Sequence, residues 1–269
     1  MKPILTIATY QGPAFRNQPD AAIEKILSIC ELSKNVDIIL FPETFVHGYF
    51  DNEIDAKKAS IDLLSQSFTD VLKMLSNIDA TIIIGVNEYS GDNIYNSALL
   101  IENGNLIGRV RKSSTYPPFD YYSLSDETSV FYKNGIGYGV SICCDINYFS
   151  RTNQLAHQGA QIIFCPMWNI ISRNHSLVPH MHNKNHLLSK ALENKIWLVC
   201  SDVIENTEQT LGVGCSCIID PLGNIVVSAQ LLTENILIYH ISSFTLQPQY
   251  MGLERANQEK YLEKYGVII

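Results

Sequence analysis

Short apolar segments rich in β-branched residues alternate with stretches of helical periodicity along almost the whole chain. This alternation predicts an α/β fold, because strands buried on both faces need helices to cover them. No Pro/Gly/Ser-rich linker and no block of charge interrupts the pattern, so we expect a single domain over residues 1–269. The expected strands are 4–10, 37–41, 81–86, 96–101, 106–112, 138–143, 161–165, 196–200, 215–219, 224–228 and 236–241. The expected helices are 20–34, 54–77, 147–158 and 179–194.

The two halves of the chain carry similar segments in the same order. Residues 37–42 resemble residues 161–166, and each copy is followed by a second buried strand and then by a hairpin with typical turn residues. Chance similarity between buried strands is the alternative explanation. Two similar halves, each a mixed sheet backed by helices, bury most apolar surface by packing sheet against sheet. The repeat therefore predicts a four-layer α-β-β-α sandwich of two mixed sheets with outer helices.

Charge and hydropathy limit the partners that this chain can have. Lys plus Arg number 19 against 27 Asp plus Glu, which gives a net charge of −8. Without a basic surface, we expect no nucleic-acid partner and no binding to an anionic membrane. No apolar run approaches the roughly 18 residues that span a bilayer, so we expect no membrane partner.

Cysteine content and the first residues predict the compartment. The seven cysteines are odd in number and lie mostly in apolar, strand-like runs, which is typical of reduced thiols. The apolar run after Met1 is too short for a signal peptide and is interpreted as a strand. We therefore expect a cytoplasmic protein.

A carboxylate directly follows an apolar strand in the segment Phe41-Pro42-Glu43-Thr44. Glutamate is rarely buried without a partner or a function. In α/β sheets, ligands bind beyond the carboxyl ends of the strands. Glu43 is therefore a candidate catalytic residue, and a turn glutamate or a carboxylate at a helix start is the alternative.

A lysine ends the basic strand Arg109-Val110-Arg111-Lys112. Because side chains alternate faces along a strand, Lys112 shares its face with the apolar Val110, while Arg109 and Arg111 share the other. Lys112 is therefore expected to point toward the core or a cleft. A solvated basic strand end is the alternative.

A cysteine lies where a strand is expected to turn into a helix, in the segment Ile142-Cys143-Cys144-Asp145. A thiol at such a turn feels the helix N-terminus, which favours the thiolate, and backbone N–H groups there can bind an oxyanion. A small core residue is the alternative for a cysteine in an apolar strand.

Taken together, Glu43, Lys112 and Cys143 resemble the Glu-Lys-Cys triad of the nitrilase superfamily of carbon–nitrogen hydrolases. The resemblance covers nearly the whole chain, and it implies the αββα fold that the repeat also predicts. The matching motifs occur in the order of the family and are Ile7–Gln11, Phe41-Pro42-Glu43 with Gly48-Tyr49, Gly108 to Lys112, Gly139 to Asp145, Pro166-x-Trp168, Ala191 to Asn194, and Gly214 to Gly223.

The resemblance implies a role for each residue of the triad. Cys143 rather than Cys144 is the nucleophile, since the family has its cysteine two residues before the aspartate. Glu43 is then the general base, and Lys112 with the backbone N–H of Cys144 stabilises the oxyanion. The implied reaction proceeds through a thioester and requires no metal and no organic cofactor.

The chain departs from the family pattern at several positions, so the resemblance does not assign the substrate. The family carries a second glutamate between its Lys and Cys motifs, and the candidates here are Asp120 and, less well placed, Glu127. The residues after the nucleophile, 147–150, and Lys190 also differ from the family.

Aromatic and histidine side chains supply further candidates. Tyr49 and Trp168 are candidate substrate-binding residues, although Trp168 also suits a core or interface position. The chain has four histidines in one region, and two of them are spaced four residues apart. No carboxylate accompanies them at a useful spacing, so we expect a polar helix face or substrate rim and no metal site. The histidines are His175, His180, His182 and His186.

The leading interpretation is an amidase-type hydrolase that cleaves a linear, non-peptide C–N bond of a small molecule and releases ammonia or an amine. A nitrilase acting on a C≡N group is the alternative within the same chemistry. A non-catalytic binding or scaffold protein with the same fold is the alternative that involves no catalysis. The apolar tail over residues 244–269 predicts a homodimer or a higher homo-oligomer, and docking of the tail on its own subunit is the alternative.

Overall fold

The computed structural model describes residues 5–115, 118–174 and 178–242. Its first sheet is built from ten strands of this part of the chain: β1 (Leu5–Pro13), β2 (Ile38–Leu40), β3 (Ile61–Asp62), β4 (Thr81–Ser90), β5 (Asn93–Glu102), β6 (Asn105–Arg111), β10 (Ile171–Ser172), β12 (Val203–Asn206), β13 (Thr210–Val213) and β16 (Asn235–Ile241). The strand order is β10-β13-β12-β1-β2-β4-β5-β6, with β16 paired to β1 and β3 paired to β4. Strands β1, β2 and β4 run parallel, and β5 and β6 are antiparallel, so the sheet is mixed.

The second sheet repeats this plan on a smaller scale. Its strands are β7 (Phe131–Lys133), β8 (Ile136–Val140), β9 (Ile162–Pro166), β11 (Trp197–Ser201), β14 (Cys217–Ile219) and β15 (Ile225–Ser228). They are ordered β15-β14-β11-β9-β8-β7. Strands β8, β9 and β11 are parallel, whereas β14 and β15 return antiparallel, as β5 and β6 do in the first sheet. The two similar halves inferred from the sequence therefore correspond to two mixed sheets.

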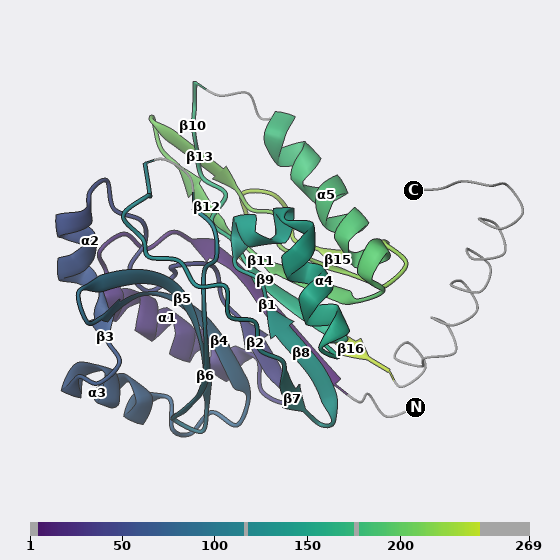
Figure 1. Cartoon of the computed structure of the whole chain (residues 1–269), viewed down its shortest axis with the longest axis horizontal. Helices are drawn as coiled ribbons and strands as arrows, with labels where there is room; N and C mark the ends of the chain where they lie inside the picture. The colour runs from purple at the N-terminus through teal and green to yellow at the C-terminus, as the bar shows by residue number, and fades with distance from the viewer. Residues whose placement is uncertain (1–4, 116–117, 175–177, 243–269) are drawn as a thin grey trace, which may run out of the picture.

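Helices cover the outer face of each sheet, and the two inner faces pack on one another (Figure 1). The helices are α1 (Pro19–Leu32), α2 (Glu53–Ala59), α3 (Gln66–Met74), α4 (Phe149–His157) and α5 (Val178–Asn194), with a 3-10 helix η1 (Cys143–Asn147). One apolar cluster lies between α1, α3 and the first sheet, a second between the sheets, and a third between the second sheet and α4 and α5. The four-layer α-β-β-α sandwich is confirmed.

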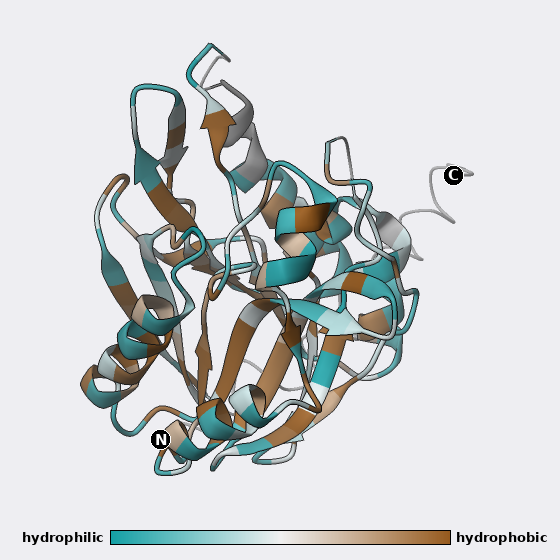
Figure 2. Cartoon of the chain, turned by 90° about the vertical axis from the view of Figure 1, so that its left-hand side faces the viewer, coloured by the Kyte–Doolittle hydropathy of each residue, from teal (hydrophilic) through white to brown (hydrophobic). Residues whose placement is uncertain are grey.

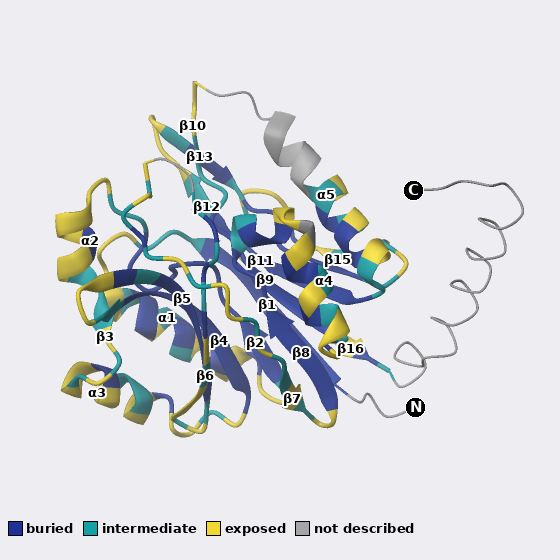
Figure 3. Cartoon of the chain, viewed as in Figure 1, coloured by how far each residue is buried: buried dark blue, intermediate teal, exposed yellow. Residues whose placement is uncertain are grey.

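Burial follows the same layering. The central strands of both sheets are buried and largely apolar, while the outer faces of the helices are exposed and polar (Figures 2 and 3). In α1 the buried residues recur three and four positions apart, as in Ile23, Ile26 and Cys30, so one stripe of the helix faces the first sheet. Burial of that stripe against the sheet is the main source of stability for such a helix.

The structure corrects several expected element boundaries. The helix expected over 54–77 is two helices, because Ser60 takes an extended conformation after α2 and the Ser65 side chain caps α3 by accepting from the Phe68 N–H at 3.1 Å. The strand expected over 138–143 ends at Val140. The short strands β3, β7, β10, β12 and β13 were not expected, because segments of two to four residues are too short to show periodicity.

The predicted oligomer and the predicted absence of a membrane span concern the C-terminal arm and the helices, respectively. The C-terminal arm, residues 244–269, lies outside the described residues, so the oligomer that it predicts stays a prediction. Within the described ranges, every helix is too short or too polar to cross a bilayer.

Candidate active site

The turn after β2 carries Glu43 into the space between the two sheets. Glu43 is 1% exposed, and the turn folds back so tightly that Thr44 takes a positive φ of 42°. Gly85 on β4 allows this approach, because a Cβ there would lie 2.3 Å from the Thr44 backbone nitrogen. The Glu43 N–H donates to the Met167 carbonyl at 3.3 Å, which links this turn to the segment after β9 in the second sheet.

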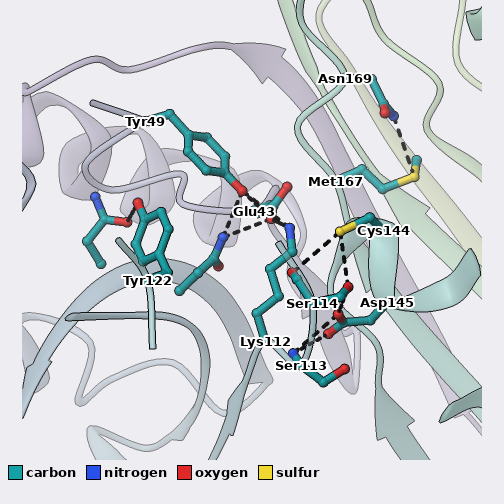
Figure 4. Close-up of polar contacts among 12 residues, drawn as sticks. Glu43, Tyr49, Lys112, Ser113, Ser114, Tyr122, Cys144, Asp145, Met167 and Asn169 are labelled. Atoms are coloured by element: carbon teal, nitrogen blue, oxygen red, sulfur yellow. Dashed lines mark hydrogen bonds and ion pairs between the residues drawn. The ribbon is translucent and has the colours of Figure 1, made fainter. Parts of the chain in front are cut away.

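One oxygen of the Glu43 carboxylate accepts hydrogen bonds from three side chains (Figure 4). Tyr49 Oη donates to Glu43 Oε1 at 2.6 Å and Asn96 Nδ2 donates at 2.9 Å, while Lys112 Nζ forms a close ion pair with the same oxygen. The other oxygen, Oε2, is buried and has no hydrogen-bond partner among the described residues. The carboxylate is thus oriented through Oε1 and keeps Oε2 free to accept a proton.

Lys112 reaches Glu43 from the end of β6, and it is 2% exposed. It lies on the inner face with the buried Val110, whereas Arg109 and Arg111 pair with Glu88 on the other face, as strand alternation predicts. Burial by itself would lower the pKa of Lys112, but the negative charge of Glu43 outweighs it and holds that pKa well above its ordinary value. Lys112 is therefore a buried cation.

Cys143 begins η1 with a positive φ of 47°, a conformation that costs a non-glycine residue on the order of 1–3 kcal/mol. Burial raises the pKa of the Cys143 thiol well above its ordinary value, the charge of Glu43 raises it further, and the charge of Lys112 lowers it. The resting residue is therefore a neutral thiol. The expectation that a helix N-terminus favours the thiolate is corrected, because burial beside Glu43 dominates and the helix that follows is one short 3-10 segment.

Asp145 bonds the turn that begins at Cys143 to the segment that follows Lys112. Its buried carboxylate accepts from the Ser114 hydroxyl at 2.6 Å and from the Ser113 N–H at 3.0 Å (Figure 4). The Cys144 thiol donates to the Ser114 carbonyl at 3.5 Å, so Cys144 is engaged by the same segment. These contacts join the residues that directly follow Lys112 to the residues that directly follow Cys143.

A pocket with a volume of about 160 Å³ lies beside Cys143. It is lined by η1, the segment after β9 and the helix α5, with the residues Cys143, Cys144, Ile146, Asn147, Met167, Asn169, His186 and Leu187. These described lining residues are apolar or polar, and none of them is Lys, Arg, Asp or Glu.

Asp202 orients the polar part of that pocket wall. Its buried carboxylate accepts from the backbone N–H and the side-chain amide of Asn169, each at 3.0 Å, and from the N–H groups of Val203 and Cys215. Burial raises the pKa of Asp202 to about 6, although these hydrogen bonds oppose the increase. Asn169 is therefore held in one orientation at the pocket.

Comparison with known proteins identifies the family of this chain. The sequence model of the carbon-nitrogen hydrolase family matches residues 6–249. The chain belongs to the carbon-nitrogen hydrolase family. The resemblance of its sequence to the nitrilase superfamily of carbon–nitrogen hydrolases is thereby confirmed.

Individual relatives of this chain differ in their names and in how much of their own length the chain matches. A glutamine-dependent NAD(+) synthetase from Aquifex aeolicus is 25% identical over 221 residues, which are 80% of this chain but 38% of that protein. An (R)-stereoselective amidase from Pseudomonas sp. is 23% identical over 206 residues, 75% of this chain and 72% of that protein. The solved structure of an amidase from Nesterenkonia sp. shares the fold with a TM-score of 0.76 at 18% identity, over 95% of this chain and 97% of that chain.

The two candidate substrate-binding residues, Tyr49 and Trp168, lie close to Glu43 and Cys143. Tyr49 contacts Glu43 through its hydroxyl, and its ring packs 5.7 Å from the ring of Trp168. Trp168 is 7% exposed, and its backbone forms a hydrogen bond with the Cys143 thiol. Neither residue lines the 160 Å³ pocket, so substrate contact by either stays a prediction.

The structure places neither candidate for a second carboxylate in the interior of this hydrolase. Asp120 and Glu127 are both exposed, whereas Glu43 and Lys112 are buried. The described contacts of Glu43 come instead from uncharged donors and Lys112, and Asn96 is the donor that the sequence analysis missed. The signal that could have identified Asn96 is its polar side chain on the buried face of β5. Ser97 pairs with Arg111 in the antiparallel ladder, so Asn96 lies opposite Lys112.

His47 gives the Glu43 turn of the hydrolase a testable pH dependence. Burial lowers the pKa of His47 from 6.5 to about 4, and its Nδ1 accepts from the Asn87 N–H at 3.1 Å. In the unfolded chain His47 is therefore protonated as the pH falls through about 6.5, whereas in the folded protein it is protonated only near pH 4. Stability is lost as the pH falls through this window, by about 3 kcal/mol for this one group. Urea unfolding of wild type and His47→Gln at pH 7.5 and pH 4.5 measures it.

The Gln variant keeps a hydrogen-bond acceptor but cannot take up the proton, so we expect its stability to change less between the two pH values. Equal changes in the two proteins would show that His47 is not the titrating group. His157→Gln, at an exposed position of α4, is the matched control and should follow wild type.

Proposed function

We propose that the protein hydrolyses small linear amides through a Cys143 thioester and releases ammonia or an amine. The observation that carries this proposal is the buried Glu43–Lys112 pair, in which Glu43 Oε2 has no hydrogen-bond partner in the described part of the chain. Both charges act on the Cys143 thiol, which lines a pocket.

The first half of the reaction forms the thioester. Because the thiol is neutral at rest, its proton has to be removed during attack, and Glu43 Oε2 is the free acceptor. Cys143 Sγ bonds to the amide carbon as the carbonyl oxygen gains negative charge, which Lys112 and the Cys144 N–H stabilise. Glu43 then gives the proton to the amide nitrogen, the C–N bond breaks, and ammonia or the amine leaves.

The second half returns the enzyme to its starting state. Glu43 takes a proton from a water molecule, the resulting hydroxide attacks the thioester carbon, and Lys112 again stabilises the oxyanion. Collapse of this intermediate breaks the C–S bond and releases the carboxylic acid, and the proton on Glu43 returns to Sγ. The cycle closes with the side chains of the site and water alone.

A relative of the same fold supports a cysteine nucleophile. In a glutamate-to-glutamine variant of the Nesterenkonia amidase, acrylamide has added to the active-site cysteine. That amidase superposes on this chain with a TM-score of 0.76. The position of Cys143 at the end of the parallel strand β8 suits the same role here.

An ammonia-release screen over matched pairs of small amides and nitriles tests the reaction class. We expect release from one or more amides and at most slow release from the nitrile with the same acyl group. Faster release from the nitriles would favour the nitrilase alternative. No release from either class, with a folded protein, would favour the non-catalytic binding protein.

Substitution of the two adjacent cysteines tests which is the nucleophile. Cys143→Ala removes a pocket-lining thiol on which the charges of Glu43 and Lys112 act, so turnover should fall to background while the unfolding temperature changes little. Cys144→Ala removes a thiol that bonds Ser114 and should retain substantial activity. The opposite pattern would shift the nucleophile by one residue. A high rate in Cys143→Ala would exclude the covalent mechanism.

Substitution of Lys112 separates catalysis from binding. Loss of an oxyanion donor lowers kcat by a factor of about 10²–10³, whereas KM should change much less, because the ammonium is needed where negative charge develops. The measurement is kcat and KM of Lys112→Met with any accepted amide, alongside Lys58→Met, whose side chain is 74% exposed on α2. A kcat within about threefold of wild type would contradict the proposed role of Lys112.

A further inference from the structure

The helix α5 brings a histidine to the nucleophile pocket that the reaction above does not use. His186 lines the pocket together with Cys143, and the next residue on α5, Leu187, is 2% exposed. His186 Nε2 is buried and has no hydrogen-bond partner among the described residues. A buried polar atom left unpaired costs free energy, so native proteins satisfy such atoms with a protein group, a water or a ligand.

The rest of the pocket wall defines what such a ligand can be. Asn169 and Asn147 add uncharged polar groups, and Ile146, Met167 and Leu187 add apolar surface. Among the described residues that line the pocket there is no Lys or Arg to neutralise a carboxylate and no Asp or Glu to pair with an ammonium. Burial of an unpaired charge in this wall would therefore be unfavourable.

The size of the pocket limits the acyl group further. Its volume of about 160 Å³ is close to that of an engineered protein cavity of roughly 150 Å³ that binds benzene. An acyl chain of a few carbon atoms fills this space when its carbonyl carbon lies at Cys143.

We propose that His186 binds a hydrogen-bonding group on the acyl chain, so that the enzyme selects small uncharged amides with a polar atom on that chain. This inference rests on the proposed amide hydrolysis and adds the substrate class. Nε2 of an imidazole is a donor or an acceptor depending on the tautomer, so a terminal carboxamide, which has both kinds of group, is the best probe. His186 is a specificity-determining residue in this account, and the triad performs the chemistry.

Three amides of nearly equal shape test the proposal. Succinamide ends in an uncharged carboxamide, 4-methylpentanamide ends in an apolar isopropyl group, and succinamate ends in a carboxylate. We expect wild type to have the highest kcat/KM with succinamide. His186→Leu should lower the ratio of kcat/KM for succinamide over 4-methylpentanamide by about ten- to a hundredfold, mainly through KM. His186→Gln should restore part of it.

The matched control is His157→Leu, which changes an exposed histidine on α4 away from the pocket and should keep the wild-type ratio. Equal kcat/KM values for succinamide and 4-methylpentanamide in wild type would overturn the proposal. So would an unchanged ratio in His186→Leu, or a preference for succinamate.

Binding to Cys143→Ala separates this inference from the proposed function. If wild type releases no ammonia from any amide, the proposed function fails, and titration calorimetry with the same three compounds decides the role of His186. Tighter binding of succinamide to Cys143→Ala, lost in Cys143→Ala/His186→Leu, would support it. Equal binding of succinamide to both proteins would overturn it.

Discussion

The site depends on one interaction, the ion pair between Glu43 and Lys112 in the space between the two sheets. Removing two charges from water is costly, and a buried pair often contributes little net stability compared with apolar residues of the same size. Here the pair is supported by Tyr49 and Asn96, which donate to the same carboxylate oxygen. The arrangement places a carboxylate and a lysine ammonium together in an environment of low dielectric, where the charge of each acts on the Cys143 thiol.

The sandwich explains how residues far apart in the sequence reach this point. Glu43 follows a parallel strand of the first sheet, Lys112 ends an antiparallel strand of that sheet, and Cys143 follows a parallel strand of the second. Packing of the two inner faces brings these strand ends together, and Asp145 then bonds the chain after Lys112 to the chain after Cys143. The three side chains therefore come together only when the two sheets pack on one another as they do here.

Much of this arrangement could be predicted from the sequence, because it follows from periodicity and order. Alternation placed Lys112 with Val110 on the inner face, and the faint repeat indicated two sheets packed together. The charge state of Cys143 could not be predicted, since it depends on burial and on the distant Glu43. Asp120 was a reasonable second carboxylate by position along the chain, but its exposure depends on a loop whose path no periodicity encodes. Asn96 is not close in sequence to any other residue of the site, and only the pairing of β5 with β6 sets it opposite Lys112.

Mass spectrometry of the acyl-enzyme shows which residue carries the acyl group during turnover. A slowly hydrolysed amide is mixed with the protein, the reaction is stopped with acid during turnover, and the modified residue is located by peptide mapping. The account predicts an added mass equal to the acyl group on Cys143, and none in the Cys143→Ala protein. An adduct on Cys144 or on any other residue, or continued hydrolysis of that amide by Cys143→Ala, would contradict it.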